Sequence, residues 1–358
     1  MDLITFRKSL TEWFEDHRRL LPWRENKEWY RIWISESMLQ QTQVAQVIPY
    51  YERFLRHFPD VNSLASASLE DVLKIWEGLG YYARARNLHE AARIIVSDHN
   101  GEIPSSYDLV RDLPGFGTYT SNAVLSIAFN QPFSVVDGNI TRVVSRLFGI
   151  EADIRLNGTK KQIARHAGEL LDPDRPGLFN EAMMELGALI CAPRDPRCSV
   201  CPVSVHCKAK NSNLVAQIPF KSPAPAKPSA TVTVYIISSG SSYLLVRRPS
   251  FGLLGGLWEF PSILSSPQRG FEKKFPDSFT LSGKITGSLP ALQHSFTHFN
   301  LRLEPVCFKA DSKKFECTFY ADSRWLDYEE LSFFPRHRSM QKITRLYRMR
   351  QKLYPSDA

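Results

Sequence analysis

A proline-rich stretch divides this chain into two parts that have different secondary-structure patterns. Residues Gln217–Ala230 (QIPFKSPAPAKPSA) contain four prolines in fourteen residues, a composition typical of a semi-rigid linker. We predict a domain over residues 1–208, a linker over 209–230 and a second domain over 231–358. The length of 358 residues agrees with two or three domains, since one domain usually holds about 100–200 residues.

The part of the chain before the linker has the apolar spacing of helices. Apolar residues recur at helical intervals in Leu64–Gly80 and Tyr119–Phe129, with proline and glycine between such segments. Tyr30–Val47 (YRIWISESMLQQTQVAQV) has the same spacing, and we predict one helix over it. We therefore expect an all-α domain over residues 1–208.

The part after the linker is rich in β-forming residues. Thr231–Ile237 (TVTVYII) and Tyr243–Arg247 (YLLVR) flank a serine- and glycine-rich segment, which predicts a hairpin. Leu301–Phe308 is a further predicted strand, and Gln341–Leu353 is a predicted basic helix. The fold class we expect is therefore multidomain, with an α+β domain after the all-α domain.

The composition fits an ordinary globular protein and favours a polyanionic partner. Hydrophobic residues make up 43% and charged residues 23%, which excludes disordered and collagen-like classes. The 45 lysines and arginines outnumber the 37 acidic residues, giving a net charge of +8, which is weak support for a nucleic-acid partner. Neither a membrane-spanning apolar run nor a secretory pattern is seen. We expect a cytoplasmic protein with no membrane partner.

Four of the six cysteines fall within 17 residues. Six, two and five residues separate Cys191, Cys198, Cys201 and Cys207. A two-residue gap lets two thiolates of one loop reach the same metal centre, and the outer pair completes four ligands. A secreted disulfide framework would spread its cysteines along the chain. The spacing predicts a metal centre, and it suits zinc and an iron–sulfur cluster about equally.

A glycine turn and a later aspartate are candidate functional elements. In Leu113–Gly117 (LPGFG), Gly115 and Gly117 allow a tight turn and a close approach of the backbone to a ligand. Their N–H groups and the next helix N-terminus would then face an anion, although a plain connection between helices has the same pattern. Asp137 ends an apolar run, and it is either a helix N-cap or a catalytic acid.

Glu36 lies in a helical segment whose apolar residues cover most of the surface. A carboxylate there is either exposed, which is the usual case, or held in a partly apolar site with a raised pKa. The run Gln40–Gln43 (QQTQ) follows it and is rich in amides. Amide side chains can fill a gap in a base stack or read a base edge.

These segments together closely resemble the MutY-type adenine DNA glycosylases, members of the helix-hairpin-helix superfamily of base-excision repair enzymes. The resemblance covers nearly the whole chain, including the linker and the second domain. Its motifs are Leu21–Arg24 (LPWR), Ser35–Val44 (SESMLQQTQV), Gly78–Leu88 (GLGYYARARNL), Leu113–Thr120 (LPGFGTYT), Val136–Asn139 (VDGN) and the four-cysteine loop over 191–207.

The resemblance implies a reaction and four catalytic residues. The enzyme would hydrolyse the N-glycosidic bond of adenine, with Glu36 as the general acid and Asp137 stabilising the oxocarbenium ion. Tyr119 and Asn139 would hold Asp137 and the sugar. Because Tyr119 stands where strand-cleaving relatives have a lysine, the resemblance implies a monofunctional glycosylase. The alternative is a non-catalytic DNA-lesion-binding iron–sulfur protein, which would be expected to lack Glu36 or Asp137.

The resemblance also implies cofactors and partners. The four cysteines would hold a [4Fe–4S] cluster, and the glycine hairpin would bind a monovalent cation. The substrate would be double-stranded DNA with adenine opposite 8-oxoguanine or guanine, bound by a monomer in a bacterial-type, nucleoid-associated setting. The residues implied to contact this DNA are Arg24, Gln41, Thr42, Tyr81, Gly115 and Gly117.

The second domain resembles Nudix hydrolases at Gly255–Pro261 (GGLWEFP). The acidic helix with which those enzymes bind Mg²⁺ is absent from residues 262–269, so we do not expect a hydrolase. In the family this domain recognises 8-oxoguanine, which implies a lesion-recognition role for Phe296, Thr297 and His298. Thr297 departs from the usual serine, because it keeps the hydroxyl but adds a methyl group.

Overall fold

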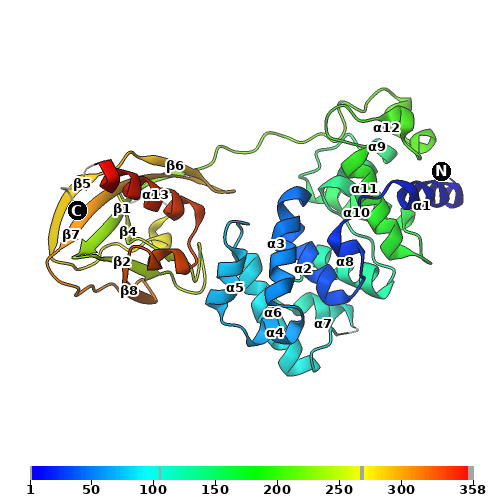
Figure 1. Cartoon of the computed structure of the whole chain (residues 1–358). Helices are drawn as coiled ribbons and strands as arrows, with labels where there is room; N and C mark the ends of the chain where they lie inside the picture. The colour runs from blue at the N-terminus through cyan, green and yellow to red at the C-terminus, as the bar shows by residue number, and fades with distance from the viewer. Residues whose placement is uncertain (1, 105, 267–269, 354–358) are drawn as a thin grey trace. The chain divides into compact units, whose positions relative to one another are not determined.

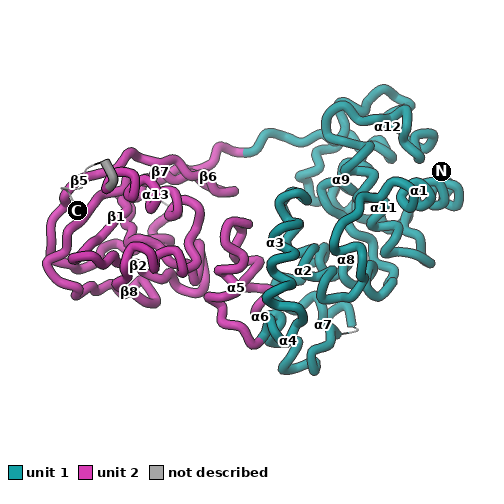
Figure 2. Tube along the Cα trace, viewed as in Figure 1, with its two compact units in different colours: residues 1–65, 90–224 teal, residues 66–89, 225–358 magenta. Residues whose placement is uncertain are grey.

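The computed structural model describes residues 2–104, 106–266 and 270–353, and these form two compact units (Figures 1 and 2). The first unit contains residues 1–65 and 90–224, and the second contains 66–89 and 225–358. The inclusion of residues 66–89 in the second unit has no counterpart in the sequence prediction. The predicted domain limits at 208 and 231 stay predictions.

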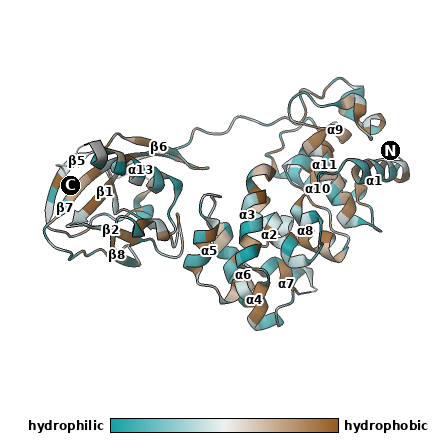
Figure 3. Ribbon diagram, viewed as in Figure 1, coloured by the Kyte–Doolittle hydropathy of each residue, from teal (hydrophilic) through white to brown (hydrophobic). Residues whose placement is uncertain are grey.

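The first unit is helical. Helix α4 ends one residue after the first segment of this unit, at residue 66, and helix α6 begins at residue 83, before the second segment starts at residue 90. Its elements are α1 (Leu3–His17), a 3₁₀ turn (Pro22–Arg24), α2 (Trp29–Leu39), α3 (Val44–His57), α4 (Val61–Ser66), α6 (Ala83–His99), α7 (Tyr107–Asp112), α8 (Thr118–Phe129), α9 (Gly138–Phe148), α10 (Asn157–Leu170), α11 (Pro176–Leu189), two 3₁₀ turns (Cys198–Val200 and Ser204–His206) and α12 (Lys208–Asn211). Figure 3 shows brown apolar and teal polar residues side by side on these helices, as expected of amphipathic helices packed around a core.

The predicted single helix over Tyr30–Val47 is wrong, because a turn separates α2 from α3. Gln41 has a φ of +57°, a left-handed conformation that an α-helix cannot contain. The side-chain amide of Gln40 donates to Thr120 Oγ1 on α8 at 3.0 Å. The amide-rich run is therefore a turn, and tertiary contacts at this point override the helical spacing.

The packing of α11 against α9 depends on a glycine. A Cβ atom at Gly187 on α11 would lie 2.6 Å from the Cβ of Asn139 on α9. By contrast, a Cβ at Gly158 on α10 would meet no atom within 4 Å. The close approach of the two helices therefore requires a residue without a side chain at position 187.

We expect Gly187→Ala to destabilise the protein by about 1–3 kcal/mol, the usual cost of overpacking. The new methyl group also displaces Asn139. Gly158→Ala is the matched control, and we expect it to be neutral or to stabilise by up to about 1 kcal/mol through helix propensity. Urea unfolding of both variants measures the difference, and equal stabilities would show that the α9–α11 contact can relax.

The second unit is built on an eight-stranded mixed sheet. Its main order is β3-β2-β1-β7-β5, while β4 pairs with β1, β6 with β7 and β8 with β2. Strands β1 and β7 are parallel, and the other pairs are antiparallel. The strands are β1 (Ser229–Ser239), β2 (Ser242–Arg247), β3 (Trp258–Glu259), β4 (Ser262–Leu264), β5 (Gly283–Ser288), β6 (Leu292–Ser295), β7 (Asn300–Ala310) and β8 (Asp322–Asp327).

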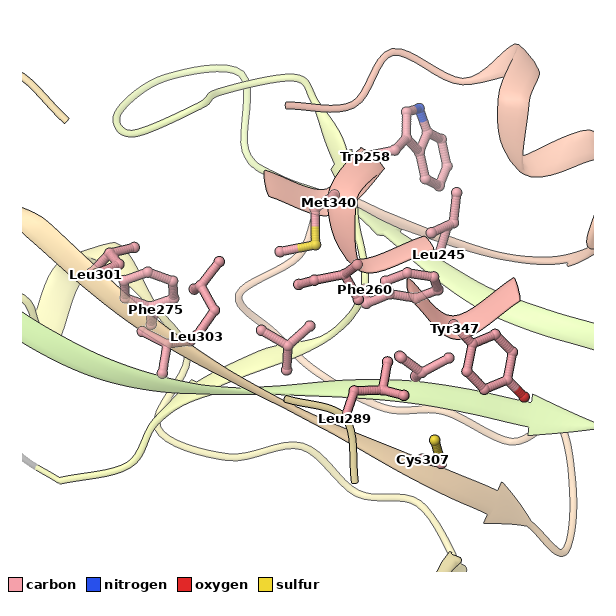
Figure 4. Close-up of a cluster of buried hydrophobic side chains, with 14 of the residues drawn as sticks. Leu245, Trp258, Phe260, Phe275, Leu289, Leu301, Leu303, Cys307, Met340 and Tyr347 are labelled. Atoms are coloured by element: carbon pink, nitrogen blue, oxygen red, sulfur yellow. The ribbon is translucent and has the colours of Figure 1, made fainter. Parts of the chain in front are cut away.

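Successive side chains of a strand point to opposite faces of the sheet, so apolar residues of one strand contribute to two hydrophobic cores. Leu245 belongs to the larger core, whereas Leu244 and Val246 belong to the smaller one. The last helix, α13 (Arg338–Leu353), contributes Met340 and Tyr347 to the larger core, which Figure 4 shows. The predicted hairpin, the third strand and the C-terminal helix are confirmed; residues 267–269 lie outside the described part of the chain.

The segment 66–89 is bonded to the sheet domain of its unit. It includes α5 (Leu69–Trp76), whose N-cap Ser68 accepts from the Asp71 N–H at 3.1 Å. The indole of Trp258 donates to Glu70 at 2.9 Å, and the Arg336 N–H donates to Glu77 at 2.8 Å.

Among the described helices, none is long and apolar enough to cross a membrane.

Candidate active site

A pocket of about 790 Å³ in the first unit gathers most of the predicted site residues. Its wall comes from the Pro22–Arg24 turn, α2, the α2–α3 turn, the starts of α8 and α9, and one face of α11. It contains all four predicted catalytic residues and five of the six residues predicted to contact DNA: Glu36, Asp137, Tyr119, Asn139, Arg24, Gln41, Thr42, Gly115 and Gly117.

Glu36 is the buried acid of this pocket. It lies on α2 and is 5% exposed, and the hydroxyl of Tyr119 donates to its Oε2 at 2.6 Å. Burial raises the pKa of Glu36 from 4.5 to about 7; the Tyr119 bond lowers it, and the charge of Asp137 raises it. The sequence left open whether Glu36 is exposed or held in a partly apolar site, and in the structure it is held in the apolar site. Glu36 can therefore carry a proton near neutral pH.

Asp137 serves both as a helix cap and as a pocket residue. As the N-cap of α9, it accepts from the Ile140 N–H at 2.7 Å. Asn139 Nδ2 donates to its other oxygen at 3.0 Å. Burial raises the pKa of Asp137, although both of these hydrogen bonds lower it. The two interpretations from the sequence, cap and active-site acid, are therefore compatible at this position.

One face of α11 lines the pocket, and the sequence analysis missed it. Glu181, Met184, Glu185 and Ala188 share this face, as their helical spacing allows. The signal that could have identified it is a pair of acids four residues apart in an otherwise apolar helix, NEAMMELGAL, because a buried carboxylate needs a partner.

The partners of these acids come from the N-terminal part of the chain. Arg19 and Arg24 both line the pocket and both bond to Glu185. Arg24 also forms an ion pair with Glu181 at 3.3 Å. The guanidinium of Arg24, which was predicted to contact DNA, is therefore paired with two carboxylates in this structure.

The glycine hairpin connects α7 to α8. Gly115 has a φ of +82°, a left-handed conformation that favours glycine, and the Phe116 N–H bonds to the Leu113 carbonyl at 3.0 Å. Gly117 is the N-cap of α8 and is exposed. The backbone at this turn can therefore approach a phosphate closely.

The four clustered cysteines line one small cavity of about 30 Å³. Arg146 on α9 donates to Cys191 Sγ at 3.3 Å, and Arg142 donates to the Cys191 carbonyl at 2.7 Å. Arg142 also donates to Asn139 Oδ1 at 2.9 Å, which connects the cysteine loop to the pocket. Within the described ranges, no group of three or more histidine, cysteine or acidic side chains is arranged around a single metal ion.

The predicted lesion-recognition residues lie in the second unit, as does Tyr81. The Phe296 ring stacks on Phe299 with centroids 4.7 Å apart. Thr297 and His298 are exposed, and Thr297 Oγ1 donates to the Tyr81 hydroxyl at 2.8 Å. Tyr81 has a φ of +50° and is 44% exposed. Tyr81, Thr297 and His298 are therefore exposed, whereas Phe296 is partly buried against the larger core.

Comparison with known proteins matches both parts of the chain. Residues 34–173 match the HhH-GPD superfamily of base excision DNA repair proteins, and residues 232–346 match the NUDIX domain. The human adenine DNA glycosylase (Homo sapiens) is 35% identical to this chain over 412 residues, covering 98% of this chain and 75% of the human protein.

Two solved structures resemble the helical part. A thermostable thymine-DNA glycosylase has a TM-score of 0.54 and 30% identity, and the match covers 59% of this chain and 97% of that protein. An endonuclease III trapped as a covalent intermediate with DNA has a TM-score of 0.50 and 22% identity, covering 58% of this chain and 95% of that one. At that identity the second likeness shows the fold alone. The predicted fold class, a helix-hairpin-helix glycosylase domain with a Nudix-like domain, is confirmed.

Proposed function

Because this chain belongs to the adenine DNA glycosylase family, we propose that it hydrolyses the N-glycosidic bond of adenine mispaired with 8-oxoguanine or guanine. The observation that carries the proposal is Glu36, a buried carboxyl with its pKa raised to about 7 in a pocket shared with Asp137. A general acid works best when its pKa lies near the working pH.

Breaking this bond places charge on both products. The leaving adenine becomes negative and the sugar becomes positive, so an enzyme must stabilise both sides. Glu36 donates its proton to the adenine, most simply at N7, and then holds or deprotonates the water that attacks the sugar. Tyr119 donates to Glu36 Oε2, and this hydrogen bond fixes the carboxyl group and stabilises its anion after the proton has left.

Asp137 acts on the sugar side. Its carboxylate stabilises the oxocarbenium-like sugar, and Asn139 orients it through the 3.0 Å hydrogen bond. Tyr119 stands where a strand-cleaving relative would have a lysine able to form a Schiff base. We therefore propose a monofunctional glycosylase that releases the base and leaves the DNA strand intact.

The adenine must leave the base stack to enter the pocket. Extrusion costs a few kcal/mol, and it costs least for a mispaired base. Gln41 and Thr42 belong to the α2–α3 turn and line the pocket. We propose that Gln41 and Tyr81 fill the duplex while Gly115 and Gly117 hold backbone phosphate. A monovalent cation bound at the hairpin would complete this contact.

The four cysteines fit a [4Fe–4S] cluster. The four residues line one cavity, and in such a cluster each thiolate binds a different iron atom, so no arrangement around a single ion is needed. When bound, the cluster supplies a structural cross-link of this loop. Cys191, Cys198, Cys201 and Cys207 would hold it, and Arg146 would bond to one of the cysteine sulfurs. Analysis for four iron and four sulfide per chain tests this assignment.

The second unit would read the base opposite the adenine. Phe296, Thr297 and His298 would contact 8-oxoguanine, with the Thr297 hydroxyl as donor. The strand β4 follows the GGLWEFP segment, and residues 262–264 contain no acid that could bind Mg²⁺. We therefore assign recognition, and no hydrolysis of nucleotides, to this unit.

Tyr119→Phe should shift the pH dependence of adenine release to higher pH. The Tyr119 hydroxyl stabilises the anion of Glu36 and so lowers its pKa, and its loss lets Glu36 keep its proton at higher pH. Single-turnover release between pH 5 and 9 measures the alkaline limb of the profile. An alkaline limb that stays in place would mean that the 2.6 Å hydrogen bond does not control the acid.

A base-release assay tests the proposed function directly. Duplexes with adenine opposite 8-oxoguanine, guanine or thymine are incubated with the protein, with and without hot alkali. We expect release opposite the first two, with strand breaks only after alkali. Strand breaks without alkali would exclude a monofunctional enzyme, and tight binding without any release would favour the non-catalytic lesion-binding protein.

A further inference from the structure

A fully buried carboxylate outside the proposed chemistry borders the active-site pocket. Glu185 on α11 is 1% exposed at its side chain. It accepts from the main-chain N–H and Nε of Arg19, both at 2.9 Å, and from Arg19 Nη2 at 2.7 Å. Arg24 Nη2 donates to it at 3.1 Å. Burial alone would raise the pKa of Glu185, but these bonds bring it down to about 2, so the group is ionised at neutral pH.

Arg24 is fixed at three of its nitrogen atoms. Its Nη2 bonds to Glu185, its Nε lies 3.3 Å from Glu181 and its Nη1 donates to the Arg19 carbonyl at 3.2 Å. The guanidinium also lies over the Phe14 ring at 5.2 Å. A planar guanidinium presents its donors in a rigid fork. These contacts therefore fix the orientation of the Arg24 guanidinium group.

Arg24 lines the same pocket as Glu36, the proposed acid. The groups that act on Glu36 are Tyr119 on α8, Asp137 at the start of α9, Glu181 on α11 and Arg24. Arg24 is the one cation among them, and it favours the ionised form of Glu36. The position of Arg24 therefore helps to set how readily Glu36 holds the proton that it must donate.

We propose that Glu185 is a positioning residue for adenine release: it holds Arg24 beside Glu181 and balances its charge, so that the proton remains on Glu36. This inference rests on the proposed function, since it gives Glu185 a role only if Glu36 is the acid. Without the Glu185 charge, the carboxylate partner left to Arg24 in this network is Glu181, with which Lys27 also pairs at 3.3 Å. The uncompensated charge of Arg24 then favours ionised Glu36 more strongly.

The test is the pH profile of Glu185→Gln, in which an amide of the same shape replaces the carboxylate. We expect the alkaline limb of single-turnover adenine release to move down by about one pH unit, because the fraction of Glu36 that is still protonated on the alkaline side then falls about tenfold. Release at pH 8 should fall about tenfold, while release at pH 5.5 should stay within about threefold of the unaltered chain. The shift is opposite in direction to that of Tyr119→Phe.

Two further variants separate positioning from folding. Glu185→Asp keeps the charge, and we expect its alkaline limb to lie closer to that of the unaltered chain than the limb of Glu185→Gln. Asp172→Asn removes another largely buried acid of the same unit, one that pairs with Arg175 and lies outside the pocket, and it should leave the profile in place. Circular dichroism and duplex binding of each variant report folding.

The outcomes distinguish this inference from the proposed function. A loss of release by the same factor at every pH, or an unmoved limb in Glu185→Gln, overturns the positioning role and leaves the proposed function standing. If the unaltered chain releases no adenine at any pH, the proposed function fails, and the role of Glu185 fails with it.

Discussion

Glu36→Gln should lower the rate of adenine release by about 10²–10⁴-fold, the usual contribution of a general acid. The amide has nearly the same shape and can still accept from the Tyr119 hydroxyl, so the pocket wall is preserved. It cannot donate a proton to the leaving base with comparable strength. Single-turnover kinetics on a duplex with adenine opposite 8-oxoguanine measure the effect, and near-normal release would refute the role of Glu36.

The same substitution should stabilise the protein at alkaline pH. The folded chain holds the Glu36 proton up to about pH 7, whereas 4.5 is the ordinary pKa of this group. Between these values the unfolded chain binds fewer protons than the folded chain, so stability falls as the pH rises. Glu36→Gln removes this cost, and at pH 8 we expect a gain of about 1–3 kcal/mol in the free energy of unfolding.

This pairing of lost activity with gained stability is the specific mark of a buried functional acid. Substitution of a merely structural buried residue would instead lower the free energy of unfolding. Asp172→Asn serves as the control, because it removes a carboxylate charge that pairs with Arg175 at 3.9 Å and lies outside the pocket. Its substitution should cost stability and leave adenine release unchanged.

The sequence was most informative where chemistry restricts residue types. The four cysteines in 17 residues and the glycine turn at 113–117 identified their segments before any fold was known, because few structures need such patterns. Three of the eight strands of the second domain, β1, β2 and β7, were also predicted, because their segments are rich in β-forming residues. Local spacing and composition were sufficient for these elements.

The sequence was least informative where distant contacts decide the structure. The helix break at Gln40 and Gln41 involves a bond to Thr120, 80 residues away, and no local pattern contains that partner. The pairing of Glu185 with Arg19 spans 166 residues, so the α11 face of the pocket was missed. The sequence could not decide whether Glu36 is exposed or buried, because the groups that surround it come from α8, α9 and α11, which are distant in the sequence.

Asp137→Asn should lower adenine release by at least about 10²-fold while leaving α9 intact. Asparagine caps helices about as well as aspartate, so the bond from the Ile140 N–H can be kept. The negative charge is lost, and with it the stabilisation of the positive sugar, which typically contributes about 10²–10³-fold. The variant thus separates the two roles that the structure combines at this position.

Asp137→Ala completes the comparison. It removes both the charge and the cap, and we expect a loss of release as large as in Asp137→Asn together with about 1 kcal/mol of lost stability. Single-turnover release and urea unfolding are measured on both variants. If Asp137→Asn released adenine at the normal rate and only Asp137→Ala were impaired, Asp137 would be a helix cap alone. The positive sugar would then need another anion in the pocket, whose lining also contains Glu181 and Glu185.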